Sequence, residues 1–290
     1  MTCWSHGAGA HDLVRRHVDE RAAVLVLAGA GMGKTKTLTA GVALRIAERG
    51  ILARRVLAVT FTNKTAGEMR ERIAALLVGR PAPSWIGTFH GLGARQLRAG
   101  PQLAGLREGF DILDADDSRR LLKRTLKTIE LGELDVGTGC DRDAVKTIST
   151  LIGRFKDDLI LPEEAAIRAE AMIASETAVD VAALRLAARA YPEYQRRLRE
   201  ANAADFGDLL LWPTHAMGRD EVLRRRLADR FDCLLADEYQ DVNAVQYRWL
   251  RLMAKSLGEI FVVGDDADKP EQDEAARIET ASRGLQPRLI

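Results

Sequence analysis

The stretch "AAVLVLAGAGMGKTKTLTA" (residues 22–40) decides the fold of this chain. Its first seven residues are continuously apolar, which is typical of a central strand in a parallel sheet covered on both faces. Three glycines then fall within five positions, and after them Leu38, Val42 and Ile46 recur at helical spacing in a segment that stops at Gly50. The predicted order is therefore strand, glycine-rich loop and helix.

This order predicts a loop that binds phosphate. Glycine-rich backbone can direct several N–H groups at one anion, and the amino terminus of the following helix also favours negative charge. The loop fits the P-loop pattern GxxxxGK[ST] except that Ala28 stands in the first position. We expect Lys34 to reach the outer phosphates and Thr35 to coordinate Mg²⁺. The predicted nucleotide-binding residues are Ala28, Gly29, Ala30, Gly31, Met32, Gly33, Lys34, Thr35 and Lys36. The alternative, a glycine-rich turn with a chance lysine, is disfavoured because strand and helix stand on the correct sides.

The segment "FDCLLADEYQD" (231–241) supplies the carboxylates that such a loop needs. Asp237 and Glu238 follow an apolar strand, and ligands bind at the carboxyl ends of strands in open α/β sheets. We expect Asp237 to hold Mg²⁺ and Glu238 to act as the base that orients the attacking water. An isolated Asp-Glu pair would more often be a solvated loop, but here it accompanies a P-loop. The pair predicts hydrolysis of a nucleoside triphosphate.

The composition is that of a soluble, cytoplasmic protein with room for two domains. The 290 residues carry a net charge of +1, so the total charge gives no general attraction to nucleic acid. No apolar run reaches the length of a membrane span, and the first residues lack the pattern of a secretory signal. Cys3, Cys140 and Cys233 lie far apart, which indicates ordinary thiols rather than a disulfide framework or a zinc site.

A long helical block separates Lys34 from Asp237. Between residues 93 and 197 the sequence is charged and helical in period; within it, for example, Leu121, Leu122, Leu126 and Ile129 form one apolar helix face. We therefore predict an α/β core from 1–92 and 198–266 with an inserted helical subdomain at 93–197. The tail, 267–290, has no apolar periodicity and is expected to be poorly ordered.

Five ordered segments resemble the UvrD/Rep type of superfamily 1 DNA helicases. They are "AGAGMGKT" (28–35), "LAVTFTNKTAGEM" (57–69), "IGTFHGLG" (86–93), "DFGDLL" (205–210) and "ADEYQD" (236–241). The resemblance implies a RecA-like core (subdomain 1A), an inserted subdomain 1B, ATP with Mg²⁺ as ligands and single-stranded DNA as partner. By the same resemblance the contacts with the strand are Phe61, Thr62, Asn63, Thr88 and His90.

Physical chemistry leaves alternatives open for these strand contacts. Phe61 follows the apolar strand "VLAVTF" (56–61) and could stack on a base. Thr62 and Asn63 would, without the resemblance, be a helix cap before "KTAGEMRERIAALL". For His90, two interpretations are about equally favoured without the resemblance. One is a half-buried histidine with local hydrogen bonds, and the other is a contact with DNA.

The sequence also departs from the helicase pattern. The stretch "HDLVRRHVDE" (11–20) lacks the glutamine with which the family recognises adenine, and Asp268 stands where a glutamine senses the γ-phosphate. The second RecA-like lobe and its arginines are missing from these 290 residues. We therefore expect the chain to bind ATP without DNA-stimulated hydrolysis or strand separation, unless a second polypeptide supplies that lobe. The alternatives are a non-catalytic, ATP-responsive DNA-binding module or a truncated product without function. A different P-loop enzyme, such as a nucleotide kinase, would not need the segments at 57–69 and 86–93.

Overall fold

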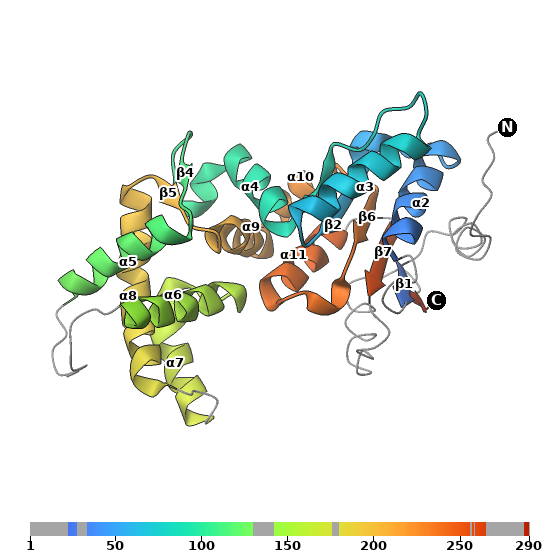
Figure 1. Ribbon diagram of the computed structural model, residues 1–290. Helices are drawn as coiled ribbons and strands as arrows, with labels where there is room; N and C mark the ends of the chain where they lie inside the picture. The colour runs from blue at the N-terminus through green and yellow to red at the C-terminus, as the bar shows by residue number, and fades with distance from the viewer. Residues whose placement is uncertain are drawn as a thin grey trace. The chain divides into compact units, whose positions relative to one another are not determined.

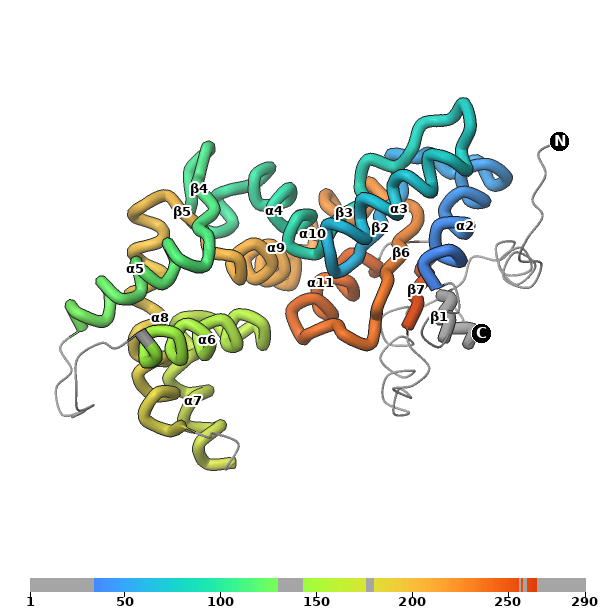
Figure 2. The backbone as a smooth tube through the Cα atoms, viewed as in Figure 1, coloured from blue at the N-terminus to red at the C-terminus, as the bar shows by residue number. Residues whose placement is uncertain are grey.

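The computed structural model describes residues 23–27, 34–129, 142–175, 180–255, 257, 259–264 and 287–289. The chain forms two compact units, the first from Met1–Leu92, Met217–Val242 and Tyr247–Ile290, the second from Gly93–Ala216 and Asn243–Gln246. The second unit is thus inserted into the first. The chain leaves the first unit within helix α4 (Phe89–Ala99) and returns within helix α9 (Asp208–Arg219), as Figure 2 traces.

The first unit is built on a six-stranded parallel sheet with the strand order β3-β2-β6-β7-β1-β8 (Figure 1). This confirms the predicted α/β class. The elements of this unit are β1 (Ala23–Leu27), α2 (Lys34–Ala47), η1 (Ala53–Arg55), β2 (Val56–Thr60), α3 (Asn63–Leu76), β3 (Trp85–Thr88), α10 (Glu221–Ala228), β6 (Cys233–Ala236), η4 (Tyr239–Asp241), β7 (Glu259–Gly264) and β8 (Pro287–Leu289), with most of α11 (Ala244–Ala254).

The central strands bury side chains on both faces, as their continuous apolar sequences predict. Cys233 and Leu235 of β6 pack with Phe261 and Val263 of β7 against α2 and α3. The predicted helix stripe of Leu38, Val42 and Ile46 lies in the same cluster, fully or almost fully buried. Alternate residues of the strands, such as Leu234 and Val262, face a small apolar cavity bounded by α11 on the other side of the sheet.

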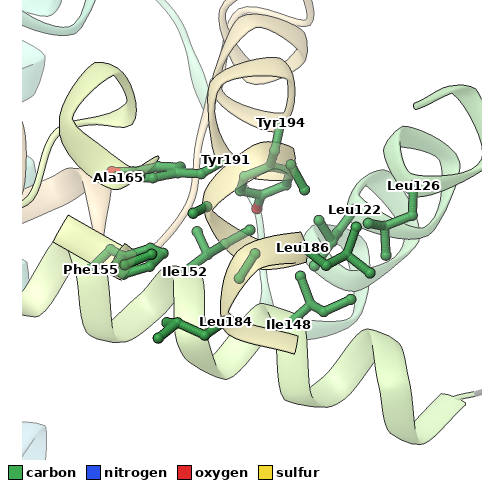
Figure 3. Packing of buried hydrophobic residues seen from close by; sticks show 14 of the residues in the cluster. Leu122, Leu126, Ile148, Ile152, Phe155, Ala165, Leu184, Leu186, Tyr191 and Tyr194 are labelled. Atoms are coloured by element: carbon green, nitrogen blue, oxygen red, sulfur yellow. The ribbon is translucent and has the colours of Figure 1, made fainter. Parts of the chain in front are cut away.

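The second unit is mainly helical and has its own core. Its elements are η2 (Pro101–Ala104), β4 (Asp111–Ile112), α5 (Ala115–Thr128), α6 (Arg142–Asp157), η3 (Pro162–Glu164), α7 (Ala165–Ala174), α8 (Val181–Glu200) and β5 (Ala203–Ala204), together with most of α4 and α9. Figure 3 shows Leu122 and Leu126 of α5 packed with residues of α6 and α8, including Ile148, Ile152 and Leu186. The predicted apolar face of α5 is therefore confirmed. No helix among the described residues is long and apolar enough to cross a membrane.

One predicted boundary differs from this arrangement. The helical unit does not end at residue 197 but continues to Ala216 and includes residues 243–246. The reason is that Leu209 and Leu211 are buried with Leu97 and Phe110 in a second core cluster of that unit. Of the predicted tail, residues 267–286 and 290 lie outside the described residues, and residues 287–289 form strand β8 beside β1.

Candidate functional site

The carboxyl ends of the parallel strands meet at one edge of the sheet, where ligands bind in α/β folds. Strand β1 leads to the predicted phosphate loop and α2, and β6 leads to Asp237 and Glu238. Only β7 lies between β1 and β6 in the sheet. The sheet order therefore brings together two segments that are about 200 residues apart in the chain.

Thr35 and Asp237 lie next to each other at this edge. The Thr35 hydroxyl donates to Asp237 Oδ2 over 3.4 Å, and the Asp237 amide donates to the Val59 carbonyl over 3.0 Å. Burial raises the pKa of the Asp237 carboxyl, and the charge of Glu238 adds to this. A hydroxyl and a carboxylate are hard oxygen ligands of the kind that Mg²⁺ prefers, so the pair fits the predicted metal role.

Lys34 and Glu238 form an ion pair across the same edge. Lys34 Nζ lies 3.6 Å from Glu238 Oε2, and the Gln240 amide donates to that oxygen over 2.7 Å. Glu238 has φ of 52° and ψ of 48°, a left-handed conformation that non-glycine residues adopt at a cost of about 1 kcal/mol or more. The backbone and Gln240 together fix the carboxylate. Sequence reasoning missed Gln240, although it follows Glu238 by two residues in the quoted segment.

The remaining predicted loop residues are Ala28 to Gly33 and Lys36. Ala28, Gly29, Ala30, Gly31, Met32 and Gly33 lie outside the described residues. Lys36 is described and lies exposed in the first turn of α2.

The residues predicted to contact single-stranded DNA follow β-strands β2 and β3, at the other end of the same sheet edge. Phe61 comes directly after β2, is partly exposed, and meets the ring of Phe89 edge-on with 5.7 Å between centroids. The Thr62 hydroxyl accepts from the Thr65 amide at 3.1 Å, so Thr62 caps α3 as the alternative reading predicted. Asn63 is exposed in the first turn of that helix.

Thr88 and His90 occupy the turn from β3 into α4. The Thr88 hydroxyl accepts from the Gly91 amide at 3.1 Å, which satisfies one of the first amides of α4. Burial lowers the pKa of His90, so its imidazole is neutral near pH 7. A neutral histidine would contact a phosphate through an N–H group rather than through a full positive charge.

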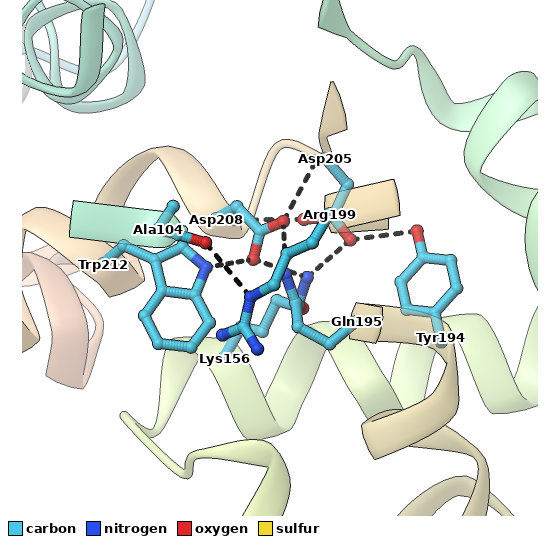
Figure 4. A network of polar contacts seen from close by, with 8 residues as sticks. All are labelled: Ala104, Lys156, Tyr194, Gln195, Arg199, Asp205, Asp208 and Trp212. Carbon is cyan, nitrogen blue, oxygen red and sulfur yellow. Dashed lines mark hydrogen bonds and ion pairs between the residues drawn. The ribbon is translucent and has the colours of Figure 1, made fainter. Parts of the chain in front are cut away.

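The segment "DFGDLL" forms a turn in the helical unit that exposes an aromatic ring. Phe206 is 59% exposed, and it is the only aromatic residue among the large hydrophobic side chains exposed in the described part of the chain. Its neighbours Asp205 and Asp208 are buried and bind Lys156 of α6 (Figure 4). Sequence reasoning missed both Phe206 and Lys156. The aspartates three residues apart before an apolar run are a capping signal that could have located the turn.

Comparison with known proteins gives a consistent picture. Residues 14–268 match the family described as UvrD/REP helicase N-terminal domain. The chain is 39% identical over 256 residues to ATP-dependent DNA helicase UvrD1 of Mycobacterium bovis, covering 86% of this chain and 31% of that protein. It is 36% identical over 265 residues to DNA helicase II of Escherichia coli strain K12, covering 91% of this chain and 34% of that protein. The chain thus spans about a third of the length of these relatives.

Proposed function

The chain belongs to the UvrD/Rep helicase family, and from that membership and the geometry of the sheet edge we propose that it binds ATP with Mg²⁺ and a single strand of DNA. One observation carries the proposal. Lys34 and Thr35 at the start of α2 meet Glu238 and Asp237 after β6, although no short stretch of sequence holds all four. Cation, hydroxyl and two carboxylates at one edge are what a magnesium nucleotide requires.

Each of these side chains has a distinct role in the proposed site. Thr35 and Asp237 would hold Mg²⁺, which would offset the negative charge of the phosphates. Lys34 would bind the outer phosphates as a point charge, in exchange for part of its contact with Glu238. Glu238, fixed by Gln240, is placed to orient a water molecule and to accept its proton.

The DNA part of the proposal rests on partly exposed aromatic and polar groups after β2 and β3 and on Phe206 in the helical unit. Phe61 and Phe206 each offer a ring on which an unpaired base could stack, an interaction worth about 1–3 kcal/mol per base. Asn63 and His90 offer hydrogen-bond donors to phosphate. Thr62 and Thr88 already cap helices. We therefore propose that they place the adjacent backbone amides toward the single-stranded DNA, and that their hydroxyls do not contact it themselves.

Turnover and strand separation are proposed for a helicase in which a second RecA-like lobe joins this part, either from the same protein or from a second polypeptide. Arginines from such a lobe would stabilise the charge of the transition state, an effect worth about 10³ to 10⁵ in rate. DNA as the substrate agrees with a cytoplasmic location.

Titration with a fluorescent ATP analogue tests the nucleotide site. Wild-type protein should bind the analogue with Mg²⁺, and Lys34→Ala should abolish binding because it removes the cation over the outer phosphates. Lys255→Ala, which removes the same charge from an exposed position after α11, is the matched control and should bind normally. Unchanged affinity in Lys34→Ala, with melting temperatures equal among the three proteins, would show that the nucleotide binds elsewhere.

A further inference from the structure

The helical unit contains a fully buried lysine that the proposed function does not yet use. Lys156 Nζ lies 2.7 Å from Asp205 Oδ2 and 2.9 Å from Asp208 Oδ1, and its side chain is 1% exposed (Figure 4). Burial alone would lower the pKa of Lys156, but the two carboxylates outweigh it and raise the pKa above its ordinary value. The ammonium group is therefore charged inside the unit.

The same two carboxylates close the turn at residues 205–208. The Asp208 amide donates to Asp205 Oδ1 over 3.0 Å, and the Asp205 amide donates to Asp208 Oδ2 over 3.2 Å. This reciprocal pair is a capping box at the start of α9. Lys156 binds the remaining oxygen of each carboxylate, so it ties the turn to α6.

Three further donors complete the network. Tyr194 donates to Asp205 Oδ2 at 3.0 Å, Gln195 to Asp208 Oδ2 at 3.0 Å, and Trp212 to Asp208 Oδ1 at 2.9 Å. All four carboxylate oxygens are thus hydrogen-bonded, which leaves the two aspartates little freedom to rotate.

The backbone of the turn also rests on the lysine stem. A Cβ added to Gly207 would lie 2.6 Å from Lys156 Cδ, closer than carbon atoms approach. Glycine at this position lets the turn lie directly against the buried side chain. Lys156 therefore sets the position of the turn through both its charge and its shape.

Phe206 lies within this fixed turn. Its side chain is 59% exposed, whereas Asp205 and Asp208 on either side are 9% and 1% exposed. Burying a lysine and two aspartates is expensive, and apolar side chains of similar size often give equal or greater stability. What the charged network supplies is one defined geometry for the turn, and the side chain that this geometry directs to solvent is an aromatic ring.

We propose that Lys156 is a positioning residue for single-strand binding, which fixes the 205–208 turn so that Phe206 presents its ring to an unpaired base. The inference rests on the proposed DNA binding. It adds that a residue with no access to DNA controls the affinity for the strand through one aromatic side chain.

A double-mutant cycle on the 290-residue chain tests the proposal, with a fluorescein-labelled oligothymidylate as probe and anisotropy as readout. Phe206→Ala should weaken binding roughly 5- to 150-fold. Lys156→Met should weaken it by a similar factor, but by less than about 2-fold when Phe206 is already alanine. Lys146→Met, on an exposed position of the same helix, is the charge-matched control and should change affinity only slightly.

Two outcomes would overturn the proposal. If folded Lys156→Met binds DNA like the wild type, or if its effect is as large without the Phe206 ring as with it, the lysine does not act through Phe206. Should Lys156→Met fail to fold, Tyr194→Phe replaces it, because it removes a single hydrogen bond to Asp205. Its smaller loss of affinity must likewise vanish in the Phe206→Ala background.

Hydrogen–deuterium exchange separates this inference from the proposed function. Exchange at the Phe206–Asp208 amides should accelerate in both Lys156→Met and Tyr194→Phe, whether or not DNA is present. Wild-type protein that fails to bind the oligonucleotide would refute the proposed DNA binding. DNA binding that depends on Phe61 but not on Phe206 or Lys156 would leave the proposed function standing and refute only the inference.

Discussion

At the scale of single residues, the candidate nucleotide site depends on a few oxygen and nitrogen atoms brought within 4 Å. The Thr35 hydroxyl and the Asp237 carboxylate are 3.4 Å apart, and Asp237 is almost fully buried. A buried carboxylate with a raised pKa is poorly solvated, so a divalent cation is a favourable partner for it.

This arrangement predicts that the Thr35 hydroxyl contributes to nucleotide binding only through the metal. Thr35→Ala should weaken binding of the ATP analogue about 10-fold or more in the presence of Mg²⁺ and hardly at all in its absence. Thr35→Ser keeps the hydroxyl and should restore the metal dependence. The measurement is a titration of the analogue with Mg²⁺ and with a chelator. An equal loss under both conditions would contradict a metal role for Thr35.

The Lys156 network predicts a particular dependence of stability on alkaline pH. Lys156 Nζ lies 5.6 Å from the centre of the Tyr191 ring. Burial raises the pKa of Tyr191 and Tyr194 above the ordinary 10, and the carboxylates raise that of Lys156 above 10.5. The folded protein thus holds these protons more tightly than the unfolded chain. Their contribution to stability is complete below about pH 10 and is lost as the pH rises through the folded-state pKa values.

Tyr194→Phe should therefore unfold more easily than wild type at pH 8, by about 1–3 kcal/mol for a lost hydrogen bond to a carboxylate. Above pH 10 its free energy of unfolding should fall less steeply than that of wild type, by up to about 1.4 kcal/mol per pH unit. Urea unfolding between pH 8 and pH 11 measures both effects. Parallel pH profiles for the two proteins would show that Tyr194 does not titrate differently on folding.

At the scale of elements, helices α4 and α9 approach each other closely enough to exclude a methyl group. A Cβ on Gly93 of α4 would lie 2.3 Å from the carbonyl oxygen of Leu209 in α9. A backbone atom cannot move aside as a side-chain tip can. At this contact α4 packs against α9. The first turn of α4 holds His90, and the start of α9 is fixed by the turn at residues 205–208.

Gly93→Ala should destabilise the protein by about 1–3 kcal/mol, because the two helices must separate to admit the methyl group. Gly153→Ala is the matched control, since Gly153 lies inside α6 with no atom within 4 Å of an added Cβ. The control should be stabilised by about 0.5–1 kcal/mol through helix propensity. Thermal unfolding of the two variants distinguishes them. Two variants of equal stability would mean that the helices can separate without cost.

At the scale of the whole molecule, the net charge of +1 excludes a general electrostatic attraction to DNA. The proposed affinity for single-stranded DNA must then come from local contacts along the sheet edge and at Phe206. These contacts are stacking of bases on rings and binding of phosphates, neither of which reads base sequence.

The expected binding of single-stranded DNA is therefore weak, independent of sequence and sensitive to salt. Each phosphate contact contributes about −0.7 to the slope of the logarithm of affinity against the logarithm of salt concentration. A few such contacts should therefore give a slope of roughly −2 to −4. Anisotropy with oligothymidylate and with a mixed sequence at several salt concentrations measures this. A preference for duplex DNA, or an affinity independent of salt, would contradict the assignment.

The sequence by itself determined the local pieces of this protein. Apolar runs, glycines and helical spacing are local signals, so the strand at 23–27, the helix from Lys34 and the strand before Asp237 could all be predicted. The parallel sheet followed, because the motif order and the carboxyl-end rule leave few other arrangements. The DNA contacts implied by the resemblance stay predictions, and two of those residues, Thr62 and Thr88, turn out to cap helices.

Only the tertiary structure decided which distant side chains meet. Whether a lysine is solvated or buried depends on neighbours from other segments, and Lys156 finds Asp205 and Asp208 about 50 residues further along the chain. Residues 198–216 likewise belong to the helical unit because Leu209 and Leu211 join its core, which no local pattern signalled. Glu238 likewise gains Lys34 from a segment about 200 residues away, because the sheet order places β1 and β6 on either side of β7. Periodicity reveals which face of an element is buried, but the partner of a buried charge is fixed only when the chain has folded.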